Sequence, residues 1–125
     1  MKMLSTVLAT TMSVLISGQA IAADELSSLV SVLATTAARI RSISDSCKVR
    51  VDPMLEAQVF ETLMSVPGVK ISGVTSHFAQ RRQTETAIRG AKCYPEDADS
   101  LTTLNSIYKS EAANLEKLIK NKFGD

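Results

Sequence analysis

The chain has 125 residues, with 14 Lys and Arg against 13 Asp and Glu, so its formal net charge at pH 7 is +1. A chain so close to neutrality lacks the positive charge with which proteins bind nucleic acids or anionic membrane surfaces. It also contains no Trp, two Tyr and three Phe, which leaves no aromatic platform for stacking sugars or bases. The composition therefore argues against all three classes of partner.

Residues 1–22 have the pattern of a secretory signal peptide. Lys2 supplies a positive head, an uncharged and partly apolar middle follows, and Ala20 and Ala22 are the small residues that a signal peptidase requires before the cut. The sequence therefore predicts cleavage between Ala22 and Ala23 and export to the periplasm or the medium. Loss of Lys2, the one charged side chain of the leader, makes the exported domain formally neutral.

An uncleaved membrane anchor is the alternative interpretation of this segment, because no charge lies between Lys2 and Asp24 and about 20 apolar residues suffice to cross a bilayer. Several Ser, Thr, Gly and Gln residues interrupt the segment and lower its hydrophobicity. Cleavage is therefore the favoured interpretation, and residues 23–125 are expected to form one domain with a modest core.

The exported domain begins with a predicted helix from Asp24 to Cys47. Its apolar positions recur mostly at spacings of three and four, which is typical of a helix with one apolar face. Such a helix needs a second element against which to bury this face. The positions are Leu26, Val30, Leu33, Ala37, Ile40 and Cys47.

A shorter helix is predicted to follow, from Pro53 to Met64. Asp52 is a suitable cap, and Pro53 is tolerated in a first turn because its missing N–H would have no helical partner there. The segment has a wide apolar face and is stopped by Val-Pro-Gly at residues 66–68.

Residues 76–89 read SHFAQRRQTETAIR, and their composition favours a helix that ends near Gly90. The face of this helix that carries its apolar residues also carries charges, so its apolar stripe is thin. Arg81 and Arg82 are adjacent, and at least one of them is expected to face solvent. Because Arg is enriched at protein interfaces, we expect a partner surface formed by Phe78, Arg81 and Arg82.

The last predicted helix begins near Pro95 and extends to Phe123. Acidic residues gather at its start and lysines at its end, which complements the helix dipole. This is the most regular helical pattern in the chain. Its apolar positions are Leu101, Leu104, Tyr108, Ala112, Leu115, Ile119 and Phe123.

Cys47 and Cys93 are the only cysteines, and in an exported chain an even number predicts a disulfide. A redox-active pair is the alternative, but the C-x-x-C spacing of such pairs is absent. If successive helices alternate in direction, the first and third end at the same pole, which brings the two cysteines together. The sequence therefore predicts an all-α domain, a small four-helix, mostly antiparallel bundle stapled by one disulfide.

Residues 48–51 and 69–72 alternate in the manner of strands and have a helix between them. They define an alternative fold, in which helices flank a minimal two-stranded βαβ unit. Two strands this short pair weakly by themselves, so the bundle is the favoured prediction.

His77 is the only histidine, so a catalytic or metal site based on histidine would have to be built around it alone. Met64 and His77 are the best available pair for haem or copper. Methionine on an apolar helix face usually fills a core, however, and the chain has no C-x-x-C-H motif for covalent haem. We therefore expect no catalytic residues, no metal and no cofactor.

The sequence shows no catalytic motif and predicts a small helical domain held by a disulfide. Both features favour an exported protein-interaction module without catalytic activity. Such a module is an inhibitor or immunity-type protein, a chaperone, or an accessory factor of an envelope or secretion system. Its expected partner is another exported protein, and the long apolar faces also allow a homodimer. The alternative function is a carrier of a small ligand, haem or metal in the bundle interior.

Overall fold

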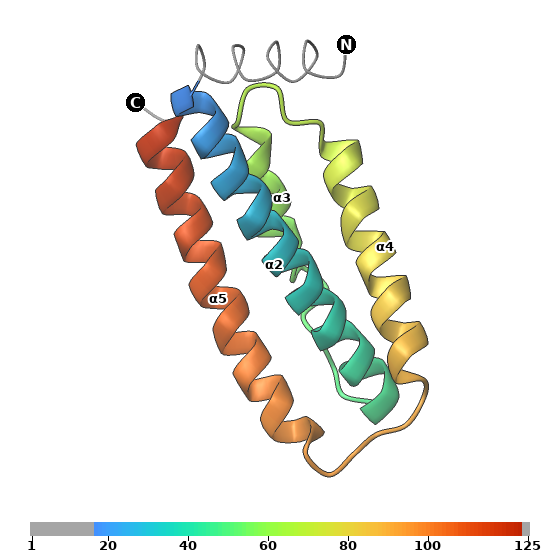
Figure 1. Ribbon diagram of the computed structural model, residues 1–125. Coiled ribbons are helices and arrows are strands. Elements are labelled where there is room, and N and C mark those ends of the chain that lie inside the picture. Colours follow the sequence, from blue (N-terminus) through green and yellow to red (C-terminus); the bar gives the residue numbers. More distant parts are fainter. Residues whose placement is uncertain (1–16, 124–125) are drawn as a thin grey trace, which may run out of the picture.

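The structure, a computed structural model, describes residues 17–123. These residues form four α-helices and the connections between them (Figure 1). The helices are α2 (Ser17–Cys47), α3 (Ala57–Met64), α4 (Ile71–Arg89) and α5 (Asp97–Lys122). The predicted all-α helical bundle is confirmed. None of the described helices combines the length and the hydrophobicity needed to cross a membrane.

The predicted signal peptide lies mostly outside the described residues, and its cleavage stays a prediction. The backbone of α2 is already helical at Ser17, so the predicted cut between Ala22 and Ala23 falls within this helix. In the uncleaved chain, the end of the leader and the start of the domain therefore share one helix. Side chains are described from Asp24 onward.

Successive helices run in opposite directions, and α2 lies between α5 and α4 with α3 behind it (Figure 1). α2 packs against α4 and α5, and α3 contacts the same two helices. α2 and α4 are therefore neighbours that run in the same direction. Within residues 17–123 the backbones of α2 and α3 do not approach each other closely, so these two helices are diagonal in the bundle.

The core forms where the apolar faces of the helices meet. The predicted apolar faces of α2 and α5 both point into it, and α4 contributes the buried Phe78 together with the partly buried Ile71 and Val74. Removal of these side chains from water, at about 25 cal/mol per Å² of apolar surface, is the main force that holds the bundle together. The buried members are Leu33, Ala34, Ala37, Ile40, Val59, Leu63, Val66, Phe78, Tyr108, Leu115 and Ile119.

Small residues let α4 lie close against α2. Ala38, Ser42 and Ser46 follow one another at every fourth position of α2 and so form a stripe along one side of the helix. Ala38 and Ser42 are buried, and the Ser46 hydroxyl donates a hydrogen bond to the Gly90 carbonyl at 3.1 Å. Gly90 ends α4 near the predicted position, with a φ of 75° that a residue without Cβ adopts freely.

α3 begins later than predicted. The Met54 N–H donates to Asp52 Oδ1 at 2.9 Å, and residues 53–56 form a turn. Asp52 therefore caps this turn, and the helix itself starts at Ala57. The start of the last helix is also shifted, from the predicted Pro95 to Asp97.

No strand is present in residues 17–123, so the βαβ alternative is wrong. Lys48, with a φ of 57°, ends α2, and residues 49–51 form the connection that follows. Residues 71–72 are the first residues of α4. The apolar residues Val51, Val69 and Ile71 pack against the core, so their alternation reflects anchoring of the connections rather than strand pairing.

The predicted disulfide is confirmed. It joins Cys47, the last residue of α2, to Cys93 in the loop between α4 and α5, with the Cα atoms 4.9 Å apart. The bond thus fixes the two parallel helices at the pole where both end. A disulfide is typical of proteins in oxidising compartments.

Candidate functional site between α2 and α4

Phe78, the expected apolar member of the partner surface, lies in the core. Phe78 is 6% exposed, and its ring packs edge-on against the ring of Phe60, with the ring centroids 4.9 Å apart. Aromatic pairs in this arrangement contribute to packing between elements, here between α3 and α4. Burial therefore favours a structural role for Phe78 over contact with a partner.

Arg81 and Arg82 stay candidates for a partner surface. The Arg82 side chain is 49% exposed, and its Nη2 lies 3.3 Å from Oδ2 of Asp45, which is itself exposed. The Arg81 side chain is less exposed and places Nη2 at 3.6 Å from Glu85 Oε2, one helical turn further along α4. The Arg82–Asp45 pair is accessible to water and is therefore weak enough to exchange for another carboxylate, whereas Glu85 in the Arg81 pair is largely buried.

Met64 and His77, the predicted pair for haem or copper, lie on different helices. Met64 is exposed at the end of α3, and His77 is half-buried on α4. Within the part of the chain whose side chains are described, the one cluster of three possible metal-ligating residues is Cys47, Cys93 and Asp97. The two sulfur atoms in this cluster are bonded to each other and do not offer thiolates.

Asp97, at the start of α5, organises the loop at the disulfide pole. Its buried carboxylate binds the Arg89 guanidinium and accepts a hydrogen bond from the Tyr94 N–H at 2.6 Å. Arg89 also lies over the Tyr94 ring, 5.5 Å from its centroid. These contacts hold the end of α4, the loop and the start of α5 together.

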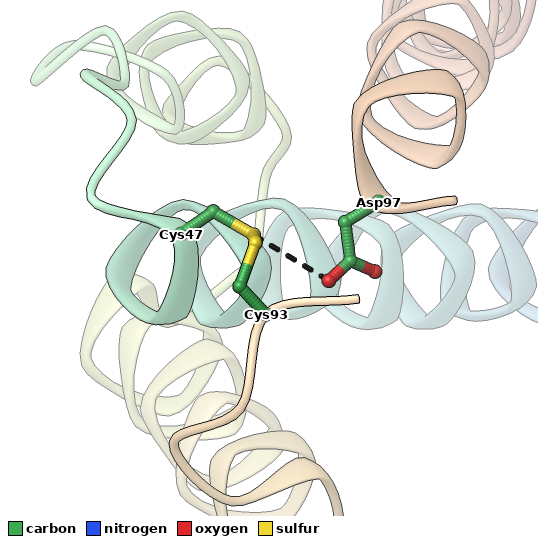
Figure 2. Close-up of side chains that lie close together, drawn as sticks. All are labelled: Cys47, Cys93 and Asp97. Carbon is green, nitrogen blue, oxygen red and sulfur yellow. Dashed lines mark hydrogen bonds between the residues drawn. A yellow bond between two sulfur atoms is a disulfide. The ribbon is translucent and has the colours of Figure 1, made fainter. Parts of the chain in front are cut away.

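The same carboxylate lies beside the disulfide (Figure 2). Asp97 Oδ2 is 3.4 Å from Cys47 Sγ. A disulfide sulfur carries no hydrogen, so this is a close contact and not a hydrogen bond while the bridge is intact. Asp97 therefore depends on Arg89 and the Tyr94 N–H to compensate its charge.

A hollow of about 380 Å³ opens between α2 and α4, next to this pole. α2 contributes Arg39, Ser42 and Ile43 to its wall. From α4 come Glu85, Ile88 and Arg89, and Tyr94 of the following loop completes it. The hollow thus combines charged groups with apolar walls, as ligand pockets do.

The charged groups around the hollow leave an excess of positive charge. Glu85 is shared by two guanidinium groups, with Oε1 3.4 Å from Arg39 Nε and Oε2 3.6 Å from Arg81 Nη2. Arg89 is paired with Asp97. Among the residues that line the hollow, two carry guanidinium groups, Arg39 and Arg89, and one carries a carboxylate, Glu85, which favours an anionic occupant.

A second hollow of about 450 Å³ lies between α2 and the start of α5. It shares Arg39 and Ile43 with the first hollow, but its other charged residues are Glu96 and Asp99. Arg39 therefore stands between a basic recess on the α4 side and an acidic one on the α5 side.

A polar cluster within the bundle connects α2, the turn before α3, and α5. Arg41 donates from Nε to Glu56 Oε2 at 2.9 Å and from Nη2 to Glu56 Oε1 at 2.6 Å. This pairing raises the pKa of Arg41. Tyr108 is buried with no hydrogen-bond partner for its hydroxyl, and burial raises the pKa of this phenol. The Arg41–Glu56 pair keeps some solvent contact and ties α2 to the turn before α3.

Sequence reasoning placed Glu85, Ile88 and Arg89 of the first hollow only within the predicted helix of residues 76–89 and did not predict the hollow itself. Arg39 and Glu85 lie 46 positions apart and meet only because α2 and α4 are neighbours. A usable signal was the run of small residues at every fourth position of α2, which marks a site of close helix approach.

Comparison with protein-family models, curated proteins and solved structures finds no match to this chain, and the function is therefore inferred from its own residues.

Proposed function

We propose that the protein is an exported protein-binding module without catalytic activity, which contacts its partner through the solvent-facing side of α4. The observation that carries this proposal is the shallow burial of α4. Of the 19 described residues of this helix, only Phe78 is buried. Ile71 and Val74 pack against the core while only partly buried, and most other residues of the helix are exposed, so a large part of its surface is available to another protein.

The chemistry of this surface favours an acidic partner. Arg82 is paired only with the exposed Asp45, and a partner carboxylate can replace this weak ion pair. Ile88, on the same helix, is 75% exposed and offers an apolar contact on the side of the helix that carries Arg81. Arginine next to exposed apolar side chains is the combination enriched at protein interfaces. Export to the periplasm is supported by the leader pattern and by the disulfide.

Photo-cross-linking in the producing cells tests this proposal. A photoreactive residue replaces Gln83, which is exposed on α4, and in a matched control it replaces Lys109, which is exposed on α5. We expect a discrete adduct from position 83 that disappears when Arg82→Glu is added, and none from position 109. Equal labelling from both positions, or labelling that survives Arg82→Glu, would remove α4 as the partner surface.

A carrier of haem or metal in the bundle interior stays a prediction with less support. The interior between the described helices is filled by apolar side chains. The hollows lined by polar groups lie at the edges of α2 instead.

A further inference from the structure

Two residues that line the hollow between α2 and α4 each carry a buried polar hydrogen without an acceptor. Ser42 is 2% exposed, lines the hollow, and has no hydrogen-bond partner for its hydroxyl. Arg89 Nε is also buried and unpaired, although Nη2 of the same side chain binds Asp97 and the Lys92 carbonyl. Unpaired buried donors are costly, so a ligand that supplies acceptor oxygens here is stabilised by more than its ordinary contacts.

The charge of the site selects the kind of acceptor. Among the residues that line the hollow, the guanidinium groups of Arg39 and Arg89 exceed the carboxylate of Glu85 by one. An occupant with one negative charge balances this excess, whereas a doubly charged phosphate would leave an uncompensated charge beside Glu85. A carboxylate also accepts two hydrogen bonds at once, which matches the two unpaired donors.

The remaining wall of the hollow is apolar. Ile43, Ile88 and the ring of Tyr94 contribute to it, and Ile43 is almost fully buried. The volume of about 380 Å³ is near the lower end of the roughly 300–1,000 Å³ typical of small-molecule sites. The space therefore suits a short apolar group rather than a long chain or a macrocycle.

We infer that this hollow binds a carboxylate carried on a short apolar group, either a free branched acid or the C-terminal residue of a peptide. The Ser42 hydroxyl and Arg89 Nε donate to the carboxylate, Arg39 supplies the balancing charge, and Ile43 and Ile88 contact the apolar part. This site shares Ile88 with the partner surface proposed on α4, but Arg82, on which the partner surface depends, does not line the hollow.

NMR titration of the oxidised ¹⁵N-labelled protein with N-acetyl-leucine tests the inference. We expect shifts in the amides of residues 42–43 and 88–89, with a Kd on the order of 1 mM for so small a ligand. N-acetyl-leucinamide, which has the same shape without the charge, is expected to bind about tenfold more weakly or not at all. 4-Methylpentanoate, which lacks the peptide group, separates the two sources of ligand. Tighter binding of this acid assigns the site to free acids, and tighter binding of N-acetyl-leucine assigns it to C-terminal residues.

Three variants locate the interaction. Ser42→Ala and Arg39→Gln are each expected to raise the Kd for N-acetyl-leucine about three- to tenfold, since each removes one interaction with the carboxylate. Arg82→Gln is the matched control, because it neutralises an arginine of α4 outside the hollow, and it is expected to leave the Kd unchanged. Circular dichroism confirms that each variant is folded before titration.

The absence of shifts up to about 20 mM, well above the millimolar affinity expected of such a ligand, would overturn the inference. Equal binding of the acid and the amide would overturn it as well, as would an unchanged Kd in Ser42→Ala. The proposed function fails separately, through the cross-links at position 83 and the effect of Arg82→Glu on them.

Discussion

Arg41 and Glu56 form a two-point ion pair that ties α2 to the turn before α3, with both side chains largely buried. Arg41 Nη2 also donates to the Asp52 carbonyl at 3.3 Å, so one guanidinium holds two parts of the turn. Loss of one partner from such a pair is costly, because the other charge keeps its desolvation penalty without compensation.

Glu56→Gln is therefore expected to lower the free energy of unfolding by about 2–3 kcal/mol, less than for a fully buried pair because some solvent contact remains. Urea denaturation monitored by circular dichroism measures this loss. Asp45→Asn is the matched control, since it breaks the exposed pair with Arg82 and is expected to cost less than about 0.5 kcal/mol. Equal losses in the two variants would show that burial adds nothing to the Arg41–Glu56 pair.

Tyr108→Phe is expected to stabilise the protein at neutral pH by about 1 kcal/mol, because it removes a buried hydroxyl without a partner and keeps the ring. The midpoint of urea denaturation reports the change. Tyr94→Phe, at a partly exposed ring, serves for comparison and is expected to have little effect. A loss of stability in Tyr108→Phe would mean that the hydroxyl makes a hydrogen bond in solution.

Alkaline pH is expected to destabilise the protein through the same residue. Folding raises the pKa of Tyr108 above its ordinary value, chiefly because burial disfavours the phenolate. The folded state favours the neutral phenol over the phenolate. The free energy of unfolding is therefore unaffected by this group below about pH 10, the ordinary Tyr pKa, and falls as the pH rises above it. The difference in unfolding free energy between Tyr108→Phe and wild type should grow by up to about 1.4 kcal/mol per pH unit there. A constant difference from pH 8 to pH 11, a range that spans the ordinary Tyr pKa of about 10, would contradict the raised pKa.

Phe78→Ala is expected to release α4 selectively. The substitution removes the one buried side chain of the described helix α4 and its contact with Phe60, at a cost of about 3–4 kcal/mol. Hydrogen exchange should then accelerate across residues 71–89 more than across α5. Ile88→Ala, at an exposed position of the same helix, is expected to change stability by less than about 0.5 kcal/mol. Uniform acceleration in both helices would mean that α4 is not an independent unit.

Removal of the disulfide by Cys47→Ala with Cys93→Ala is expected to cost about 4 kcal/mol for a loop of this length in the chain-entropy model. The sequence separation of 46 residues sets this value. Denaturation of the variant, compared with oxidised and reduced wild type, gives the cost. A difference below about 1 kcal/mol would show that the Arg89–Asp97 pair already holds this pole without the covalent bond.

Periodicity predicted what depends on local sequence. The apolar spacing of residues 26–47 and 101–123 identified the faces of α2 and α5 that the core contains, and two cysteines in a chain with a leader pattern allowed one pairing. The charged composition of residues 76–89 correctly indicated a helix with a thin apolar stripe. The same pattern placed Phe78 and Ile88 on that stripe, but it did not show that Phe78 would be buried while Ile88 stays exposed, and we expected Phe78 at a partner surface.

The order of helices around the bundle could not be predicted in the same way. An apolar face shows that a helix has a partner, but it does not say which helix that partner is. The ion pair between Arg39 and Glu85, and the hollow beside it, exist only because α2 and α4 are neighbours. Likewise, Asp is favoured both in turns and at helix N-caps. Only the backbone conformation of residues 53–56 shows that Asp52 caps a turn and not the helix.

The diagonal placement of α2 and α3 affects how fast the chain folds. In a bundle where each helix packs on its successor, hairpins of adjacent helices assemble early through local contacts. Here α2 packs on α4 and α5, which are distant from it in the sequence. Long loops must therefore close before most of the core can form. Refolding should therefore be slower than in a hairpin-built bundle of equal length. Oxidation of Cys47 and Cys93 in the unfolded chain should accelerate refolding. The disulfide already holds the end of α2 close to the end of α4, and these two helices are neighbours in the folded bundle.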